Sequence, residues 1–304
     1  MIERITEKSH NQINIFAPAK INLFLAVTGH REDGFHELTT ILAKLSIGDS
    51  LKIQRIEGNH NIQLQCPGFN NLQNEKNLAY QAAKLWFKKT GENWAVEILL
   101  NKEIPPMSGL GGGSSDAVSA LIAINELGDN KLSHNKLYEL ATEIGSDCPS
   151  FLEQGLSIAQ GRGECVSTLN HQVAEKLIGQ EVLLFRPNLG LSTAEVYGQL
   201  AQKKKYSSVE WTNERLQEWE SNRLSIHQFL HNDLENAVFA KHVYFPTLFD
   251  HIIYKYDLNP QLSGSGSCCF LFIPKGFQEL PILKKEISQA WGEDTWIRHC
   301  KIIV

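Results

Sequence analysis

The sequence predicts an α+β fold in two domains. Segments in which apolar and polar residues alternate, as in strands, are interleaved with segments whose apolar residues recur every three or four positions, as in helices. This mixture occurs in both halves of the chain, and a length of 304 residues suits one large or two medium domains. We place the boundary near residues 160 to 175 and divide the chain into 1–168 and 169–304.

The first half is expected to open with a strand that begins at Ile13. Its apolar residues fall on one parity, and Lys20 and Asn22 share the other, so these two polar side chains point the same way. The segment LKIQRI at 51–56 also alternates, and VEILL at 96–100 is a further strand candidate. Together these segments fit an antiparallel or mixed sheet.

Three helices are expected in the first half from the spacing of apolar residues. Asn77 is a favourable N-cap for the first helix, which should end at Gly91. The second follows the glycines at 109–113, is apolar on most sides and should lie deep in the core before it ends at Gly128. The third shows the i, i+3, i+4, i+7 pattern and should end at Gly145.

The second half is predicted to repeat this mixture of strands and helices. Strands are expected at 182–187, 268–273 and 296–304, and helices at the capping box Ser192–Glu195 and around 234–239, 248–256 and 278–291. The polar, tryptophan-containing region 203–230 is interpreted as an inserted helical excursion rather than as core.

Composition and charge argue against several classes of protein. The net charge of -5 argues against a nucleic-acid partner, because such proteins concentrate positive charge. The N-terminal segment lacks the order of a signal peptide, and no apolar run approaches the roughly 18 residues that span a membrane. The six cysteines form no CxxC pair and have no metal-ligand spacing. We expect a cytoplasmic protein with reduced thiols, no structural zinc and no membrane partner; the oligomeric state stays open.

The segment PPMSGLGGGSS at 105–115 is the main indication of function. Its glycines stand directly before an apolar helix, so bare backbone N–H groups can surround a phosphate at the helix N-terminus. A Walker A loop needs a lysine where Ser114 stands, and the spacing fits a dinucleotide fingerprint poorly. A flexible linker is the remaining alternative, but linkers do not usually separate a strand from a buried helix.

Taken alone, this segment predicts a phosphate-binding loop, and the resemblance described next implies that it binds ATP in an ATP-dependent kinase. The predicted ATP-binding residues are Pro105, Pro106, Met107, Ser108, Gly109, Leu110, Gly111, Gly112, Gly113, Ser114 and Ser115. The hydroxyl of either Ser114 or Ser115 is a candidate ligand for a Mg²⁺ ion held by the phosphates, and other metal ligands stay open.

This loop resembles the phosphate loop of the GHMP kinase superfamily, named for galactokinase, homoserine kinase, mevalonate kinase and phosphomevalonate kinase. Within it, further segments resemble the 4-diphosphocytidyl-2-C-methyl-D-erythritol kinases, so that the resemblance covers nearly the whole chain. These segments are PAKINLFL at 18–25, TGHREDGFHEL at 28–38, GSDCPSFL at 145–152, PNLGLSTAEVY at 187–197, HNDLENAV at 231–238 and LSGSGS at 262–267.

The resemblance implies a two-domain GHMP kinase fold with the active site in the cleft. Residues 1–168 would form an N-terminal ATP-binding α/β domain, and residues 169–304 a C-terminal ferredoxin-like α/β domain on the substrate side. The implied reaction is phosphorylation of the 2-hydroxyl of a small cytidyl substrate in the non-mevalonate isoprenoid pathway, with ATP and Mg²⁺. The alternatives are another GHMP kinase, of homoserine or mevalonate type, and a catalytically silent nucleotide-binding protein on this fold.

The resemblance also implies roles for individual residues. Lys20 and Asp147 match the catalytic lysine and aspartate: a carboxylate can accept the hydroxyl proton, and a lysine neutralises charge and keeps that carboxylate ionised. Taken alone, Lys20 could equally be a solvated lysine at a strand end, and Asp147 a turn residue.

The remaining matches concern the cytidyl substrate. They are Phe35 and His36 for the base, Tyr197 as a second aromatic that covers it, and Asn22 and Thr193 as polar residues of the pocket. Taken alone, Tyr197 would more often be core and the two polar residues ordinary caps. This sequence departs from the family in Phe35, where tyrosine is frequent, and in Pro106 and Met107 of the loop.

Overall fold

Two long antiparallel strands, β2 (Gln12–His30) and β3 (His36–Ile56), run through the centre of the protein. The computed structural model describes residues 4–59, 61–169, 171–203 and 205–304. Residues 1–3, which belong to the N-terminal segment interpreted above as free of a signal peptide, and Lys204 lie outside the described residues. Within the described part of the chain, no helix combines the length and apolar character needed to span a membrane.

Strand β3 is longer than the sequence predicts. The alternation indicates only residues 51–56, but the strand begins at His36. Its first part carries Thr39, Thr40 and Lys44, all of which are buried, so that both faces of the strand are covered and no alternation survives. Strand β2 changes in the same way, because it alternates up to Ala17 and is buried on both faces from there to Val27.

The strands form two sheets, and the prediction of a mixed sheet is confirmed. The larger sheet has the order β1-β2-β3-β5-β4, with β6 on β3, β7 on β6 and β9 on β2; its pairs β4–β5 and β2–β9 are parallel. The smaller, antiparallel sheet has the order β10-β11-β8-β12. The remaining bounds are β1 Ile5–Lys8, β4 Ile62–Gln65, β5 Ala95–Asn101, β6 Ser157–Gly161, β7 Cys165–Thr168, β8 Glu181–Arg186, β9 His231–Asn232, β10 Gln261–Leu262, β11 Cys269–Ile273 and β12 Trp296–Lys301.

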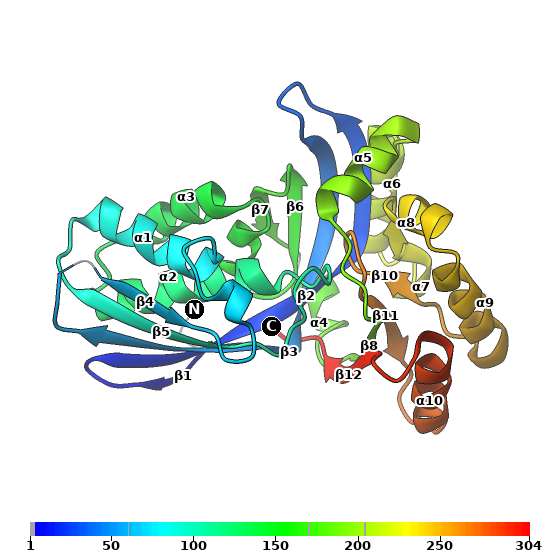
Figure 1. Cartoon of the computed structure of the whole chain (residues 1–304). Coiled ribbons are helices and arrows are strands. Elements are labelled where there is room, and N and C mark those ends of the chain that lie inside the picture. Colours follow the sequence, from blue (N-terminus) through cyan, green and yellow to red (C-terminus); the bar gives the residue numbers. More distant parts are fainter. Residues whose placement is uncertain (1–3, 60, 170, 204) are drawn as a thin grey trace.

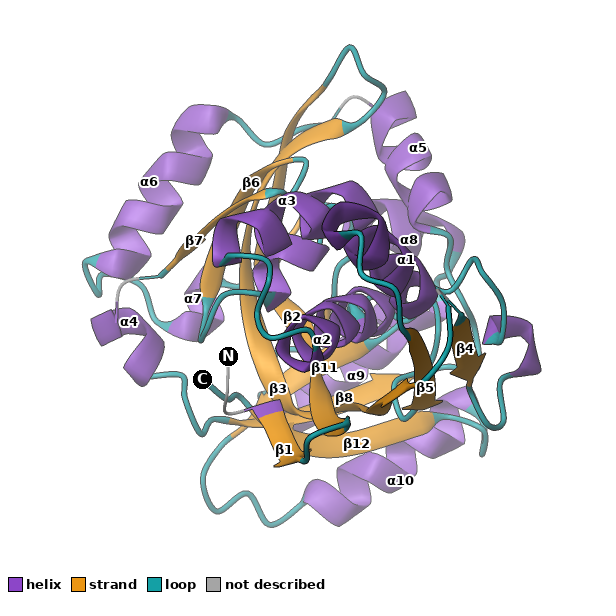
Figure 2. Cartoon of the chain, turned by 90° about the vertical axis from the view of Figure 1, so that its left-hand side faces the viewer, coloured by secondary structure: helices purple, strands orange, loops and turns teal. Residues whose placement is uncertain are grey.

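The three predicted helices of the first half are confirmed and cover one face of the larger sheet (Figure 1). They are α1 Leu78–Thr90, α2 Gly112–Leu127 and α3 His134–Ile144; two 3-10 turns, η2 Asn70–Leu72 and η3 Cys148–Phe151, flank them. The Asn77 side chain caps α1 by accepting from the Ala79 N–H, and Gly91 ends it in the left-handed conformation. Figure 2 shows α2 at the centre of this part, enclosed by α1, α3 and strands.

The helices of the second half cover the outer face of the smaller sheet. Leu183 and Phe185 of β8 pack against them, whereas Val182 and Leu184 point the other way, toward β2 and β3. These helices are α5 Thr193–Lys203, α8 Glu235–Lys241, α9 Tyr244–Tyr256 and α10 Leu280–Trp291, and the short α4 His171–Glu175 precedes β8. The predicted helices here are confirmed, apart from shifts of a few residues at their ends.

The region 203–230 contains two helices beyond α5, as predicted, but several of their side chains belong to the core. It forms α6 (Val209–Glu220) and α7 (Ile226–Phe229). The rings of Trp219 and Phe229 stack at 4.1 Å, and the Phe229 ring stacks on Phe24 of β2 at 4.9 Å. The interpretation as an excursion was wrong because the polar majority of these helices faces solvent, while a few large aromatic residues fill the core.

The division of the chain between residues 168 and 169 stays a prediction. Strand β9 comes from the second segment but pairs with β2 of the larger sheet. Leu45 and Ile302 also form a bridge across the two segments. The two segments therefore share hydrogen-bonded structure as well as a core.

Candidate active site

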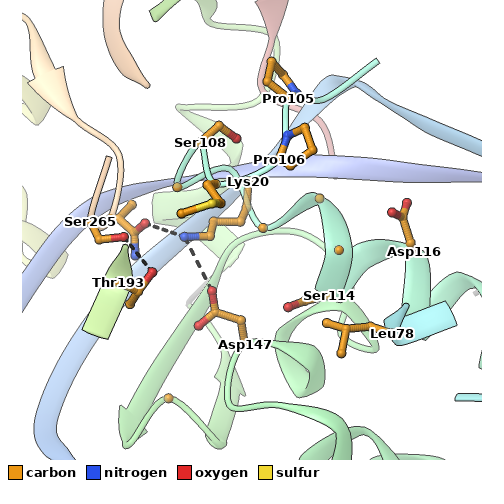
Figure 3. Close-up of a pocket in the computed structure, with 18 of the residues that line it drawn as sticks. Lys20, Leu78, Pro105, Pro106, Ser108, Ser114, Asp116, Asp147, Thr193 and Ser265 are labelled. Atoms are coloured by element: carbon orange, nitrogen blue, oxygen red, sulfur yellow. Dashed lines mark hydrogen bonds and ion pairs between the residues drawn. The ribbon is translucent and has the colours of Figure 1, made fainter. Parts of the chain in front are cut away.

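A cavity of about 490 Å³ lies where the two halves of the chain meet. The predicted ATP-binding loop forms one side, and α5 together with the turn at 262–267 forms another (Figure 3). The residues that line it are Lys20, Asn22, Leu25, Leu38, Thr40, Leu72, Lys76, Asn77, Leu78, Lys102, Pro105, Pro106, Met107, Ser108, Gly109, Gly111, Gly112, Gly113, Ser114, Asp116, Asp147, Gly163, Thr193, Tyr197, Gly264 and Ser265.

The predicted ATP-binding loop ends in the first turn of α2. Gly109 and Gly111 have φ values of 78° and 69°, which residues with a Cβ adopt at a cost. A Cβ on Gly109 would also lie 2.1 Å from the Ser263 carbonyl oxygen. Because α2 begins at Gly112, its first N–H groups have no partner within the helix, and Gly112, Gly113 and Ser114 of this first turn line the cavity.

Two of the predicted ATP-binding residues do not line the cavity. Leu110 is buried in the core, where its carbonyl oxygen accepts a 2.9 Å hydrogen bond from the Lys20 N–H. The Ser115 side chain is buried, and its hydroxyl has no hydrogen-bond partner in the part of the chain that the structure describes. Ser114, by contrast, lines the cavity. Met107 adopts a positive φ of 55° and is exposed. Pro106 is exposed as well, so the two loop residues that depart from the family lie on the solvent side of the loop.

Lys20 and Asp147, predicted to be catalytic, form an ion pair inside the cavity. The distance between Lys20 Nζ and Asp147 Oδ2 is 3.7 Å, and the side chains are 5% and 49% exposed. Lys20 Nζ also donates to Asn22 Oδ1 at 2.7 Å, as expected for residues of one parity on a strand, and Asn22 Nδ2 donates to Thr40 Oγ1. Burial lowers the pKa of Lys20, and the charge of Asp147 opposes that shift.

The wall of the cavity next to the Lys20 amino group carries Thr193 and Tyr197 of α5. Thr193 Oγ1 lies 2.9 Å from Ser265 Oγ, and Figure 3 shows this pair beside the amino group of Lys20. The Tyr197 ring lies 4.9 Å from the ring of His36. Burial raises the pKa of Tyr197, and the nearby Asp147 and Asp233 raise it further, so its phenol stays protonated near neutral pH.

The His36 ring lies against Tyr197, and neither Phe35 nor His36 is among the residues that line the cavity. His36 is buried, and within the described residues its Nε2 atom has no hydrogen-bond partner. Burial lowers the pKa of His36, and His30 lowers it further. Phe35 is 48% exposed, with the Arg162 guanidinium 4.7 Å from its ring centre. The structure thus brings His36 to Tyr197 but leaves Phe35 outside the cavity.

A buried charge cluster beside the loop was not predicted. Lys102 Nζ contacts Asp49 Oδ2 at 2.5 Å and Asp116 Oδ2 at 2.8 Å. Burial lowers the pKa of Lys102, but both carboxylates outweigh it, so the pKa is raised. Burial raises the pKa of Asp116 to about 8, although the charge of Lys102 lowers it. Asp116 Oδ1 has no hydrogen-bond partner among the residues that the structure describes. The only signal of this cluster in the sequence is that Lys102 and Asp116 stand on either side of the glycine-rich segment at 105–115.

The cavity also reaches the start of α1, which the sequence did not connect with the site. Leu72, Lys76, Asn77 and Leu78 line this end. Figure 3 places Leu78 on the far side of Ser114 from Lys20, so this wall can receive the part of a nucleotide that lies beyond its phosphates. No local pattern indicates this, because the loop and the helix meet only in the folded chain.

Comparisons with known proteins show the family to which the chain belongs. Residues 77–155, which include α1, the loop and Asp147, match the family model of the GHMP kinases N terminal domain. Together with the relatives described in the next paragraph, this match shows the class: the protein is a GHMP kinase, an ATP-dependent kinase of small molecules, and the predicted fold class is confirmed.

Full-length relatives define the family more closely. The chain is 32% identical over 293 residues to a 4-diphosphocytidyl-2-C-methyl-D-erythritol kinase of Desulfitobacterium hafniense (strain Y51), covering 95% of this chain and 96% of the relative. It is 34% identical over 302 residues to the enzyme of that name from Methylacidiphilum infernorum (isolate V4), covering 96% and 98%. A crystal structure of 4-(cytidine 5'-diphospho)-2C-methyl-D-erythritol kinase superposes with a TM-score of 0.73 at 31% identity, covering 95% of this chain and 99% of that one. The chain belongs to the 4-diphosphocytidyl-2-C-methyl-D-erythritol kinase family.

Proposed function

We propose that this protein transfers the γ-phosphoryl group of ATP to the 2-hydroxyl of 4-diphosphocytidyl-2-C-methyl-D-erythritol, in the non-mevalonate isoprenoid pathway. The observation that carries the proposal is the ion pair of Lys20 and Asp147, which lies between the glycine-rich loop and the wall formed by α5. An acceptor hydroxyl beside Asp147 would have the loop-bound phosphates on one side and the rest of its molecule on the other.

In the proposed mechanism, the oxygen of the substrate hydroxyl bonds to the γ-phosphorus of ATP, and Asp147 accepts the proton that this hydroxyl loses. The bond between that phosphorus and the bridging oxygen breaks, and ADP leaves. Lys20 is held by Asn22 and Asp147, so its charge is fixed where negative charge gathers during transfer. Most of the rate enhancement then comes from positioning and electrostatics.

The cytidyl group is assigned to the α5 side of the cavity. Tyr197 offers an aromatic face there, and the unpartnered Nε2 of His36 behind it can hydrogen-bond a base edge. Stacking by Phe35 would require the loop at 31–35 to move, because its ring now packs under Arg162 at the surface. Phe35 therefore has the weakest geometric support among the proposed substrate residues.

Mg²⁺ is proposed as the partner of the ATP phosphates. The residues present fit such an ion: Ser114 lines the cavity, and the buried Ser115 hydroxyl and Asp116 Oδ1 have no hydrogen-bond partner among the described residues. These are oxygen donors, which Mg²⁺ prefers. When bound, the ion would neutralise charge on the phosphates, while the loop N–H groups hold their oxygens.

A coupled ADP-release assay tests the proposed function. The cytidyl substrate is supplied beside homoserine and mevalonate, each with ATP and Mg²⁺. We expect turnover with the cytidyl substrate only, and phosphorus NMR of the product should place the new phosphate on the 2-hydroxyl. Turnover with homoserine or mevalonate instead would assign the protein to another GHMP activity, and ATP binding without turnover of any of the three would indicate a silent nucleotide-binding protein.

A further inference from the structure

The turn at 262–267 packs directly against the groups proposed to react. Its Gly264 and Ser265 line the cavity. A Cβ on Gly264 would lie 3.1 Å from Asn22 Oδ1 and 3.4 Å from Lys20 Nζ, so the turn leaves little free space beside the ion pair. Ser263 Oγ also donates to the Gly109 carbonyl oxygen of the phosphate loop at 3.1 Å. A displacement of this turn therefore changes both the loop and the surroundings of Lys20.

One side chain, Asn232, determines much of the position of this turn. Asn232 Nδ2 donates to the carbonyl oxygens of Leu262 and Gly264, both at 2.8 Å, and Asn232 Oδ1 accepts from the Leu234 N–H at 2.9 Å. The residue is 5% exposed and is absent from the cavity lining. Its amide therefore satisfies two carbonyls of the turn without reaching the substrate.

Asn232 also ties the turn to the strand that carries the proposed catalytic lysine. Strand β9, which contains Asn232, pairs in parallel with Phe24 and Leu25 of β2, directly beyond Asn22. Glu235 adds a second connection, because its Oε1 accepts from the Leu262 N–H at 2.7 Å. The segment 231–235 thus holds β2 and the turn in a fixed relation, although it lies more than 200 residues from Lys20 in sequence.

We propose that Asn232 is a positioning residue for phosphoryl transfer, which acts by holding the turn 262–267 against Lys20 and Gly109. This inference rests on the proposed function. Only an amide fits the site, because aspartate has the same shape but no N–H groups, so that two buried carbonyls would lose their donors and face a carboxylate. The expected defect is in the geometry of the reacting groups, and therefore in kcat more than in either KM.

The test compares Asn232→Asp with the matched variant Asn125→Asp in the ADP-release assay. Asn125 is also buried and multiply bonded: its Nδ2 donates to the Leu132 carbonyl oxygen, and its Oδ1 accepts from Trp86 Nε1. It lies near the C-terminal end of α2, away from the loop. We expect both variants to lower the unfolding temperature, but only Asn232→Asp to lower kcat, by ~10- to 100-fold, with both KM values changed less than about threefold.

Other outcomes would overturn the inference. Equal kcat losses in the two variants would assign Asn232 a purely structural role, and so would a kcat like that of the wild type in folded Asn232→Asp. If Asn232→Asp does not fold, the pair Asn232→Ser and Asn125→Ser is compared in the same way, because serine keeps one donor. Absence of wild-type turnover would count against the proposed function itself, and the wild-type reaction in each experiment keeps the two failures distinct.

Discussion

The two glycine-rich turns of the active site are built in different ways. The loop at 109–113 takes much of its shape from its own residues, since Gly109 and Gly111 adopt positive φ and Gly112 begins the first turn of α2. The turn at 262–267 also contains glycines, but its position depends on Asn232, Glu235 and Thr193, none of which is close in sequence. The conformation of the first turn follows largely from its local sequence, whereas the position of the second is set by tertiary contacts.

The largest effect is expected at the point that both turns surround. Asp147→Asn should lower kcat by ~10²- to 10⁴-fold, because the amide cannot accept the hydroxyl proton, while the KM for ATP should change little. Steady-state kinetics with the cytidyl substrate measures both. If Asp147→Asn kept the wild-type kcat, Asp147 would not be the base, and the two turns would not surround the group that accepts the proton.

Gly109→Ala tests the contact between the two turns. The new Cβ would meet the Ser263 carbonyl oxygen at 2.1 Å at a residue that also needs a positive φ, so kcat/KM should fall by ~100-fold. Gly113→Ala in the same loop is the matched variant, because its Cβ would meet only Leu78 Cδ1 at 3.6 Å. A larger loss in Gly113→Ala than in Gly109→Ala would show that crowding between the turns is unimportant.

Glu235→Gln tests the support of the second turn through pH. Burial raises the pKa of Glu235 to about 7, against the Leu262 N–H, which lowers it. Between pH 4.5, the ordinary value, and 7, the unfolded chain releases a proton that the folded chain keeps, so the wild type loses stability as pH rises. Glutamine accepts the same N–H without titrating, so the variant should gain on the order of 2–3 kcal/mol relative to the wild type from pH 5 to pH 8.

Urea unfolding of both proteins at several pH values measures this difference. The expected curves converge near pH 5 and separate toward pH 8. Curves that run parallel over the whole range would mean that Glu235 ionises normally in the folded protein.

The smallest effect is expected at Thr193, which contacts the second turn from α5. Thr193→Val removes one hydroxyl contact to Ser265 and should raise the KM for the cytidyl substrate about 2- to 10-fold, with the KM for ATP unchanged. Thr247→Val on α9 is the control, because its hydroxyl bonds only the Val243 carbonyl of its own helix. A selective rise in the KM for ATP would contradict this assignment, because it would place ATP rather than the cytidyl substrate beside α5.

The same contrast explains what the sequence could predict. The cap at Asn77, the glycine-rich loop before α2 and the shared parity of Lys20 and Asn22 are local patterns, and each is present in the structure. Residues 36–50 of β3 were missed because buried polar side chains conceal the strand period. Lys102 with Asp116, and Asn232 with its turn, could not be predicted because tertiary contacts create both sets.

The length of β2 and β3 bears on how cooperatively the protein unfolds. Ile15 and Leu51 lie in the core under α1 to α3, whereas Ile21 and Ile41 of the same strands lie in the core beneath the smaller sheet. Both cores depend on β2 and β3, so unfolding of one core removes packing that holds these strands in place for the other core. Calorimetry should therefore record a single endotherm whose van't Hoff and calorimetric enthalpies agree, rather than two separate transitions for two halves of the chain.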